Sequence, residues 1–269
     1  MRYLIDCPVV RNDELAAGQY RMRLHAPEIA RAAAPGQFCM IEVATGLYPF
    51  LRRPMCFEQI EGDEITILYK VEGEGTRLMS AFVPGQRLNV QGPLGRGFPI
   101  DPSYERHILV AGGIGVATFP GLAKVIAEHC ARPPEVVLAA RNKELILCED
   151  EFRAVGCEVH IATDDGSAGR KAFAADVLKE LEPGARTRVY ACGPMIMMRT
   201  TSDAALKAGA SCLVSLEAQM ACGDGACLGC VVESTVEQEG EHMVRVCLDG
   251  PVFDTHLIDW EAHNTAYAP

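Results

Sequence analysis

The sequence has 269 residues, of which 49% are hydrophobic and 23% charged, and its formal net charge at pH 7 is −11. This length suits two domains with a small appendage, and this composition argues against long disordered segments. The negative charge argues against nucleic acid or an anionic membrane as the main partner.

The twelve cysteines raise the question of the cellular compartment. The first residues, Met1–Asp6, contain no apolar core of signal-peptide length, and no apolar run approaches the ~18 residues of a membrane span. We therefore expect a cytoplasmic protein with no membrane partner, whose cysteines are free thiols or metal ligands instead of disulfides.

Residues 1–98 alternate short strand-like runs with turn residues. The expected strands are Leu4–Val10, Gln19–His25, Phe38–Val43, Met55–Ile60, Glu64–Val71 and Arg87–Val90. No long helix interrupts them, so the pattern predicts a small six-stranded antiparallel barrel. The segment Gln91–Phe98 is expected to be the exit of the chain from this barrel.

Two features of the barrel segment indicate phosphate binding. Arg52 and Arg53 precede Pro54, and arginine forks match phosphate oxygens. Gly75 and Thr76 are expected to open a short helix, whose N-terminus favours an anion. Each feature alone is more simply a solvated arginine pair or an ordinary turn, but their occurrence together favours a phosphate site.

Residues 99–215 change to alternating strands and helices. Strands are expected at His107–Ala111, Glu135–Ala140, Glu158–Ala162, Arg188–Ala191 and Cys212–Ser215, with helices near 118–130, 148–155, 171–181 and 194–209. This order predicts a five-stranded parallel sheet covered by helices on both faces. Its ligands should lie at the carboxyl ends of the strands.

The loops at those strand ends suit a dinucleotide. Gly112, Gly113 and Gly115 leave bare backbone for a pyrophosphate or nicotinamide, although they lack the full glycine fingerprint. Asp164 or Asp165 can accept hydrogen bonds from ribose hydroxyls, which favours NAD over NADP. Arg141 leaves NADP open, and Asp165 could instead cap the following turn.

The fourth strand ends at Cys192, Gly193 and Pro194, which form another candidate nucleotide loop. The simpler interpretation of Cys192 is a small buried hydrophobic residue.

The cysteines near the C-terminus have the spacing of a [2Fe–2S] loop. Cys222, Cys227 and Cys230 are separated by four and then two residues, and Cys247 follows sixteen residues after Cys230. A zinc ribbon usually pairs two C-x-x-C knuckles, whereas only Cys227 and Cys230 form one here. The assignment of Cys247 rests on spacing and on the lack of a better fourth cysteine.

The chain as a whole resembles a known family. Arg53–Cys56 resembles the flavin segment of the ferredoxin reductase superfamily, and Gly112–Gly115 with Cys192–Met195 resembles its pyridine-nucleotide signatures. With these segments, the chain is similar to the electron-transfer subunits of the two-subunit, NAD-dependent dihydroorotate dehydrogenases. The further segments that carry this resemblance are Tyr69–Thr76, Ala140–Glu144, Ala162–Ser167, Ser215–Cys230, Asp249–Phe253 and Trp260.

The resemblance implies three domains: an FAD-binding barrel over 1–98, an NAD-binding unit over 99–215 and a [2Fe–2S] domain over 216–269. It also implies an FMN-containing catalytic partner that oxidises dihydroorotate in pyrimidine biosynthesis, in a heterotetramer. The cluster ligands would be Cys222, Cys227, Cys230 and Cys247, and the FAD contacts would be Arg53, Pro54, Met55, Cys56, Leu68, Tyr69, Lys70, Gly75 and Thr76.

In this scheme the chain converts single-electron transfer into hydride transfer to transiently bound NAD, and none of its residues acts as an acid or base on dihydroorotate. The cysteine loop would lie near the subunit interface, with Leu228 as a candidate partner contact.

Two residues depart from the family pattern. Cys56 occupies a position where relatives usually have Ser or Thr, and Thr118 one where they usually have proline. A thiol is a weaker hydrogen-bond donor than a hydroxyl, so the flavin potential or affinity could differ. The unusual Cys56 therefore keeps one alternative open: a reductase subunit of another oxidoreductase, such as a hydrogenase or a ferredoxin-dependent complex. A separate, non-enzyme alternative is a zinc-stabilised binding module that has lost its flavin.

Overall fold

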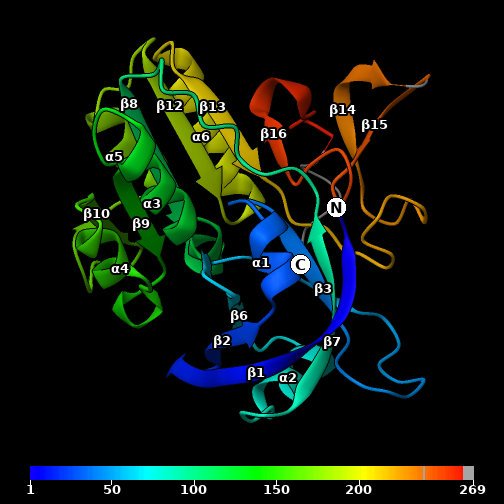
Figure 1. Cartoon of the computed structure of the whole chain (residues 1–269). Helices are drawn as coiled ribbons and strands as arrows, with labels where there is room; N and C mark the ends of the chain where they lie inside the picture. The colour runs from blue at the N-terminus through cyan, green and yellow to red at the C-terminus, as the bar shows by residue number, and fades with distance from the viewer. Residues whose placement is uncertain (239, 263–269) are drawn as a thin grey trace.

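The computed structural model describes residues 1–238 and 240–262, whose strands form three sheets (Figure 1). Residues 263–269, the end of the predicted cluster domain, lie outside the described residues, as does residue 239. No helix within the described part of the chain is long and apolar enough to cross a membrane.

The first sheet is antiparallel, and its strands have the order β4-β3-β7-β1-β2-β6-β5. Its members are β1 (Tyr3–Ala16), β2 (Gln19–His25), β3 (Phe38–Ile41), β4 (Arg53–Cys56), β5 (Gln59–Glu61), β6 (Glu64–Lys70) and β7 (Arg87–Leu94). The antiparallel barrel prediction is confirmed, with seven strands where six were expected.

The extra strand arises because the predicted strand Met55–Ile60 is divided. Its two parts, β4 and β5, lie at opposite edges of the sheet, and Phe57 and Glu58 pass from one edge to the other. The Phe57 N–H donates to the Gln37 carbonyl at 3.2 Å, and the Glu58 N–H donates to the Thr66 carbonyl at 2.8 Å. This link curls the sheet around the barrel core.

Other local features of the barrel differ from the sequence prediction. Strand β7 continues to Leu94, so Gln91–Leu94 is a strand and the exit begins at Gly95, whose φ is +71°. The helix α1 (Pro27–Ala32) was not expected; its single turn begins with a proline, whose fixed φ suits that position. Helix α2 (Glu74–Ser80) begins one residue before the predicted start.

The second sheet contains the five parallel strands that the sequence predicts. They are β8 (Arg106–Gly112), β9 (Glu135–Ala140), β10 (Glu158–Thr163), β12 (Thr187–Cys192) and β13 (Ser211–Ser215). Two short strands extend its edges: β11 (Arg170–Lys171) pairs with β10, and β16 (Val252–Asp254) runs antiparallel to β13. The full order is β11-β10-β9-β8-β12-β13-β16.

Helices cover both faces of this sheet, as expected. Alternate residues of β8 divide between two cores, because successive side chains of a strand point to opposite faces. Ile108 and Val110 share a core with the helices α5 (Ala174–Glu180) and α6 (Met195–Lys207), whereas Leu109 shares one with α3 (Pro120–His129) and α4 (Glu149–Ala154). The 3₁₀ helix η1 (Gly113–Thr118) follows β8 directly, and η2 (Lys143–Leu145) follows β9 after two residues.

The C-terminal part joins both larger sheets. After the cysteine loop, β14 (Val231–Gln238) and β15 (Glu241–Arg245) form a hairpin, and β16 then returns to the parallel sheet before the 3₁₀ helix η3 (Thr255–Leu257). Cys230 and Cys247 are buried in one core with Met40 of the barrel and Val214 of the parallel sheet. The cysteine loop is therefore packed against a rigid support.

Candidate functional site

The two predicted phosphate motifs come together in the structure. Gly75, at the start of α2, lies against the Arg53 side chain, so that a Cβ at Gly75 would be 2.5 Å from the guanidinium carbon of Arg53. Only glycine allows this approach. Arg52 has a different role, because it bonds to Glu42 at 2.9 Å and to the Asn89 side chain at 2.7 Å and so clamps the base of the loop before β4.

The hydroxyl of Thr76 is used in capping α2. Its Oγ1 accepts hydrogen bonds from the N–H groups of Glu72 at 3.0 Å and Gly73 at 3.2 Å. The β-to-α turn is thus also a structural cap, which was the simpler interpretation of this motif.

Strand β6 presents its candidate residues in different directions. The Tyr69 side chain is buried in the barrel core, and its hydroxyl bonds to Asn12 Oδ1 at 2.9 Å. Leu68 is buried on the opposite face, whereas Lys70 is exposed and pairs with Glu72 at 2.7 Å. Tyr69 can therefore offer only its backbone to a ligand.

Cys56 of β4 and Cys192 of β12 are electrostatic neighbours across the junction of the barrel and the parallel sheet. Burial raises the pKa of Cys56 to about 12, and the charges of Glu217 and Glu58 add to this effect. Burial also raises the pKa of Cys192 well above its usual range, with Glu217 and Cys56 contributing. Both residues are therefore neutral thiols at physiological pH, and Cys192 is the small buried residue that its simpler interpretation predicted.

Glu217 is a candidate functional residue to which the sequence prediction gave no role. Its side chain is exposed in the isolated chain, and desolvation by the neighbouring protein, together with the charge of Glu72, raises the pKa of its carboxyl group. Glu217 follows β13 by two residues, and carboxyl ends of parallel strands are where ligand-facing residues occur. The Ser215-Leu-Glu217 segment marked the family, and its position after a strand was the signal for a role.

The glycine loops after β8 and β12 pack backbone to backbone. Gly193 has φ of +150°, and a Cβ there would lie 2.9 Å from the Gly112 Cα. A Cβ at Gly115 would lie 2.6 Å from the Cys192 carbonyl oxygen, and one at Gly112 would lie 2.9 Å from Pro194 Cδ. Gly113, with φ of +54°, has no atom within 4 Å of its Cβ position and leaves one side of the loop open.

Thr118, the departure at the end of this loop, is buried, and its Oγ1 has no hydrogen-bond partner in the described structure. Pro120 occupies the first turn of α3 instead.

The predicted ribose-binding residues belong to a tightly bonded turn. Asp165 accepts hydrogen bonds from the Ser167 N–H at 2.9 Å and the Ser167 hydroxyl at 2.6 Å, and these bonds lower the pKa of Asp165. Ser167 Oγ in turn accepts from the Lys143 N–H at 2.8 Å. Asp165 therefore caps a turn, as its alternative interpretation stated, whereas the Asp164 side chain is exposed.

The four candidate cluster cysteines form two pairs. Cys222 Sγ accepts the Cys227 N–H at 3.4 Å, and Cys230 Sγ accepts the Cys247 N–H at 3.4 Å. Hydrogen bonds from the Gly229 N–H and from Cys222 lower the pKa of Cys227 to about 7. Burial, with Cys230 beside it, raises that of Cys247 to about 12. No three His, Cys, Asp or Glu side chains of the described residues form a site for one metal ion.

Two pairs of thiols fit a two-iron cluster, because each iron of a [2Fe–2S] cluster takes two protein ligands. The loop that carries three of these cysteines lies on the barrel: a Cβ at Gly223 would be 2.6 Å from Met40 Cγ. Cys227 is exposed, and Leu228, with φ of +59°, is 58% exposed, so this side of the loop faces solvent.

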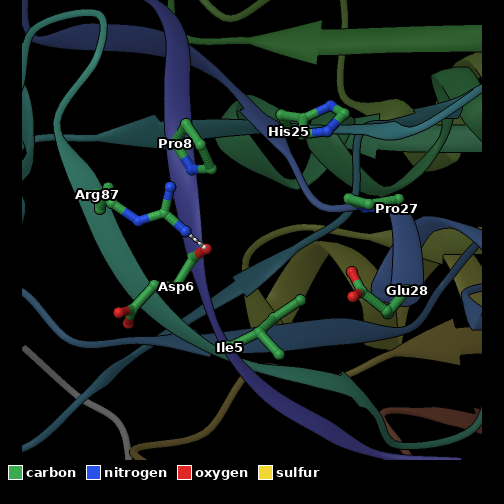
Figure 2. A pocket seen from close by; sticks show the side chains of 7 residues that line it. All are labelled: Ile5, Asp6, Pro8, His25, Pro27, Glu28 and Arg87. Carbon is green, nitrogen blue, oxygen red and sulfur yellow. Dashed lines mark hydrogen bonds between the residues drawn. The ribbon is translucent and has the colours of Figure 1, made fainter.

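A separate pocket of about 420 Å³ lies on the outside of the barrel (Figure 2). Its lining residues are Ile5, Asp6, Pro8, His25, Pro27, Glu28 and Arg87, and none of them is a predicted site residue. Arg87 is held by the Asp6 carbonyl at 2.8 Å. The pocket is distinct from the cofactor-facing residues.

Comparisons with known proteins match the parallel sheet and the cysteine loop. The family model of the oxidoreductase NAD-binding domain matches residues 109–203. That of the iron-sulfur cluster binding domain of dihydroorotate dehydrogenase B matches residues 217–259.

Curated relatives cover nearly the whole chain. The chain is 37% identical over 265 residues to the dihydroorotate dehydrogenase B (NAD⁺) electron transfer subunit of Desulforamulus reducens, covering 97% of this chain and 100% of that one. It is 35% identical to the subunit of the same name from Fusobacterium nucleatum, covering 92% and 95%.

Solved structures share the fold. An NADH-dependent reduced ferredoxin-NADP oxidoreductase, studied for flavin-based electron bifurcation, superposes with a TM-score of 0.84 at 29% identity, covering 96% of this chain and 91% of that one. A ferredoxin-NADP⁺ reductase from Neisseria gonorrhoeae with bound FAD and NADP has a TM-score of 0.66 at 16% identity, covering 77% and 92%.

Proposed function

The chain belongs to the family of electron transfer subunits of NAD⁺-dependent dihydroorotate dehydrogenase B, and we propose that it accepts electrons from the FMN of a catalytic partner subunit and delivers them to NAD⁺. The observation that carries this proposal is the 37% identity to a relative of that name in an alignment that covers 97% of this chain. A [2Fe–2S] cluster and FAD are the bound carriers, and the chain is an oxidoreductase subunit.

The barrel, residues 1–98, would bind FAD. Arg53 would hold the pyrophosphate beside the start of α2, and the close approach of Gly75 to its guanidinium supports this role. Pro54, Met55 and Cys56 would line the flavin along β4, with Leu68–Lys70 contributing backbone from β6. The capping bonds of Thr76 orient the same turn.

The unit over residues 99–215 would bind the dinucleotide. Gly112, Gly113 and Gly115, together with Cys192, Gly193 and Pro194, form the surface for a nicotinamide, and the open side of Gly113 supports this role. The exposed carboxylate of Asp164 remains the better candidate for ribose hydroxyls, since Asp165 is engaged in its turn. NAD is preferred because these are acidic residues.

Cys56, Cys192 and Glu217 would surround the reacting centre. Bound FAD supplies hydride exchange with NAD⁺ and single-electron exchange with the cluster. The thiols are neutral and exclude water from the junction, whereas the Glu217 carboxyl, whose pKa is raised, can hold the proton that accompanies hydride transfer.

The C-terminal segment from residue 216 would hold the cluster. The pairs Cys222–Cys227 and Cys230–Cys247 would each bind one iron, and the N–H bonds to Cys222, Cys227 and Cys230 would stabilise the thiolates. The exposed Cys227 side of the loop would face the FMN-bearing subunit, in a heterotetramer of two copies of each chain. A reducing compartment such as the cytoplasm would keep the cysteines reduced as cluster ligands and thiols.

The test is copurification followed by spectroscopy without air. The proposal expects a complex with an FMN-containing dihydroorotate dehydrogenase subunit that reduces NAD⁺ with dihydroorotate, and flavin bands together with iron–sulfur absorption. Ferredoxin belongs in the same assay, because the solved structure at 29% identity is a ferredoxin-NADP oxidoreductase. A protein that reduces only ferredoxin and binds no dihydroorotate dehydrogenase subunit would refute the proposal.

A further inference from the structure

A buried ion pair lies where the barrel meets the parallel sheet. Glu58, in the link between β4 and β5, has a relative exposure of 0%. Arg21 on β2 donates to both of its carboxylate oxygens, from Nε to Oε2 at 3.0 Å and from Nη2 to Oε1 at 2.6 Å. A buried carboxylate without such a partner would be strongly destabilising, so this pair fixes Glu58 in one position.

The parallel-sheet side attaches to the same pair. Cys148, which precedes α4, donates from Sγ to Glu58 Oε1 at 3.5 Å, and Glu151 of α4 pairs with Arg21 at 2.6 Å. The N–H of Gly121 in α3 donates to the Glu58 backbone carbonyl at 2.8 Å. Two helices on one face of the sheet are thus anchored to a single residue of the barrel.

The backbone of Cys148 adopts an unusual conformation at this attachment. Its φ is +64°, in the left-handed region that non-glycine residues rarely adopt. Such a conformation is unfavourable for a non-glycine residue and persists only where surrounding contacts hold it. Here the thiol contacts both Glu58 and Arg21, since Arg21 Nη2 also lies 3.6 Å from Sγ.

The pair also connects the two candidate cofactor surfaces by a short path. Glu58 follows Cys56, the end of the flavin strand β4, by two residues. Gly121 lies just after η1, the loop that carries Gly113 and Gly115. A displacement at Glu58 would therefore move the flavin strand and the nicotinamide loop relative to each other.

We propose that Glu58, held by Arg21 and Cys148, is a positioning residue that sets the separation between strand β4 and the nicotinamide loop. This inference rests on the proposed function, in which hydride passes between ligands of those two segments. A misplacement of about 1 Å costs on the order of 100-fold in rate, so the hydride step is the property most sensitive to this contact.

The experiment uses the purified complex with its cofactors and measures reduction of bound FAD by NADH without air. Glu58→Gln should lower the limiting rate by about tenfold or more. The NADH concentration at half-saturation, the FAD content and the oxidation of reduced enzyme by ferricyanide should stay unchanged, because none of them depends on that separation.

The matched control is Glu135→Gln. Glu135 forms a comparable, partly buried bidentate ion pair with Arg106, which donates from Nε at 2.6 Å and from Nη2. In this pair both residues belong to the parallel sheet. This variant should retain the wild-type limiting rate.

A milder pair of variants tests the contact of Glu58 with Cys148. Cys148→Ala should slow the hydride step severalfold, and Cys148→Ser, which keeps a donor to Glu58, should restore the rate.

A wild-type limiting rate in both Glu58→Gln and Cys148→Ala, or an equal loss in Glu135→Gln, would overturn this inference alone. So would a parallel loss of the ferricyanide reaction. If NADH does not reduce the FAD of the wild-type complex, the proposed function is wrong, and this inference fails with it.

Discussion

Cys56 is the residue at which this chain departs from its family at the flavin strand. Its thiol is neutral, because burial raises its pKa to about 12, and a neutral thiol is a weak hydrogen-bond donor. Cys56→Ser should therefore add a hydrogen bond of about 1 kcal/mol and tighten FAD binding about fivefold. Titration of the flavin-free protein with FAD, followed by flavin fluorescence, measures this affinity.

Cys39→Ser is the control for Cys56→Ser, since Cys39 is fully buried in the barrel core on the neighbouring strand. The same tightening in Cys39→Ser would contradict a specific role for position 56.

Glu217 should make the hydride step depend on pH. Desolvation and Glu72 raise its pKa, and the groups beside it are the thiols of Cys56 and Cys192. A raised pKa means that the carboxyl keeps its proton to higher pH than an ordinary glutamate, so its ability to accept a proton is lost as pH falls through that raised value. Glu217→Gln should remove this acidic limb from the pH profile of FAD reoxidation by NAD⁺.

Glu72→Gln provides the comparison for Glu217, because removing the neighbouring negative charge should shift the limb to lower pH without abolishing it. Identical profiles in the wild type and Glu217→Gln would show that another group handles the proton.

At the scale of single elements, the cysteine loop permits a test of the ligand pairs. Cys227→Ser should bleach the iron–sulfur absorption and leave FAD bound, because Cys227 is paired with Cys222 and is not one of the predicted flavin contacts on the barrel. Cys157→Ser is the control, as this thiol is buried near α3 and α4. Retained iron–sulfur bands in Cys227→Ser would remove it from the ligand set.

The sequence predicted elements with strong periodicity well and elements set by tertiary contacts poorly. The five parallel strands follow from apolar runs that must be buried on both faces. The division of the predicted strand Met55–Ile60 into β4 and β5 could not be predicted from the sequence. It depends on tertiary hydrogen bonds from the link between them to Gln37 and Thr66. Strand β16 was missed for a related reason, since three residues carry no periodic signal until they pair with β13.

In the candidate site, too, features with a local sequence signal could be predicted, and features that depend on tertiary contacts could not. Glycine positions could be predicted, because a close backbone approach excludes side chains, and Gly75, Gly112 and Gly193 all show such approaches. The separate roles of Arg52 and Arg53 could not, since only the fold brings Asn89 beside one and Gly75 beside the other. The electrostatic influence of Glu217 on Cys56 and Cys192 likewise depends on how the sheets meet.

At the scale of the whole molecule, the cysteine loop and the loop between β3 and β4 project from the same side, away from the parallel sheet (Figure 1). Electrons that enter through a partner subunit should cross on this side, where Cys227 is exposed and Leu228 is 58% exposed. An apolar contact that is buried on association contributes about 1.5–3 kcal/mol. Leu228→Asp should therefore weaken the complex with the catalytic subunit by at least about tenfold, because it also places a charge in the contact.

Phe173→Asp is the matched control for Leu228→Asp, since Phe173 is 69% exposed and lies before α5 on the parallel sheet. Sedimentation or calorimetry with the catalytic subunit gives both affinities, while NADH reduction of ferricyanide by the isolated chain reports that FAD and the nucleotide site are intact. Loss of that activity in Leu228→Asp would indicate damage to the FAD or nucleotide site. Equal affinities for Leu228→Asp and the wild type would place the partner on another face, and electrons would then need a different entry point from the one that Cys227 offers.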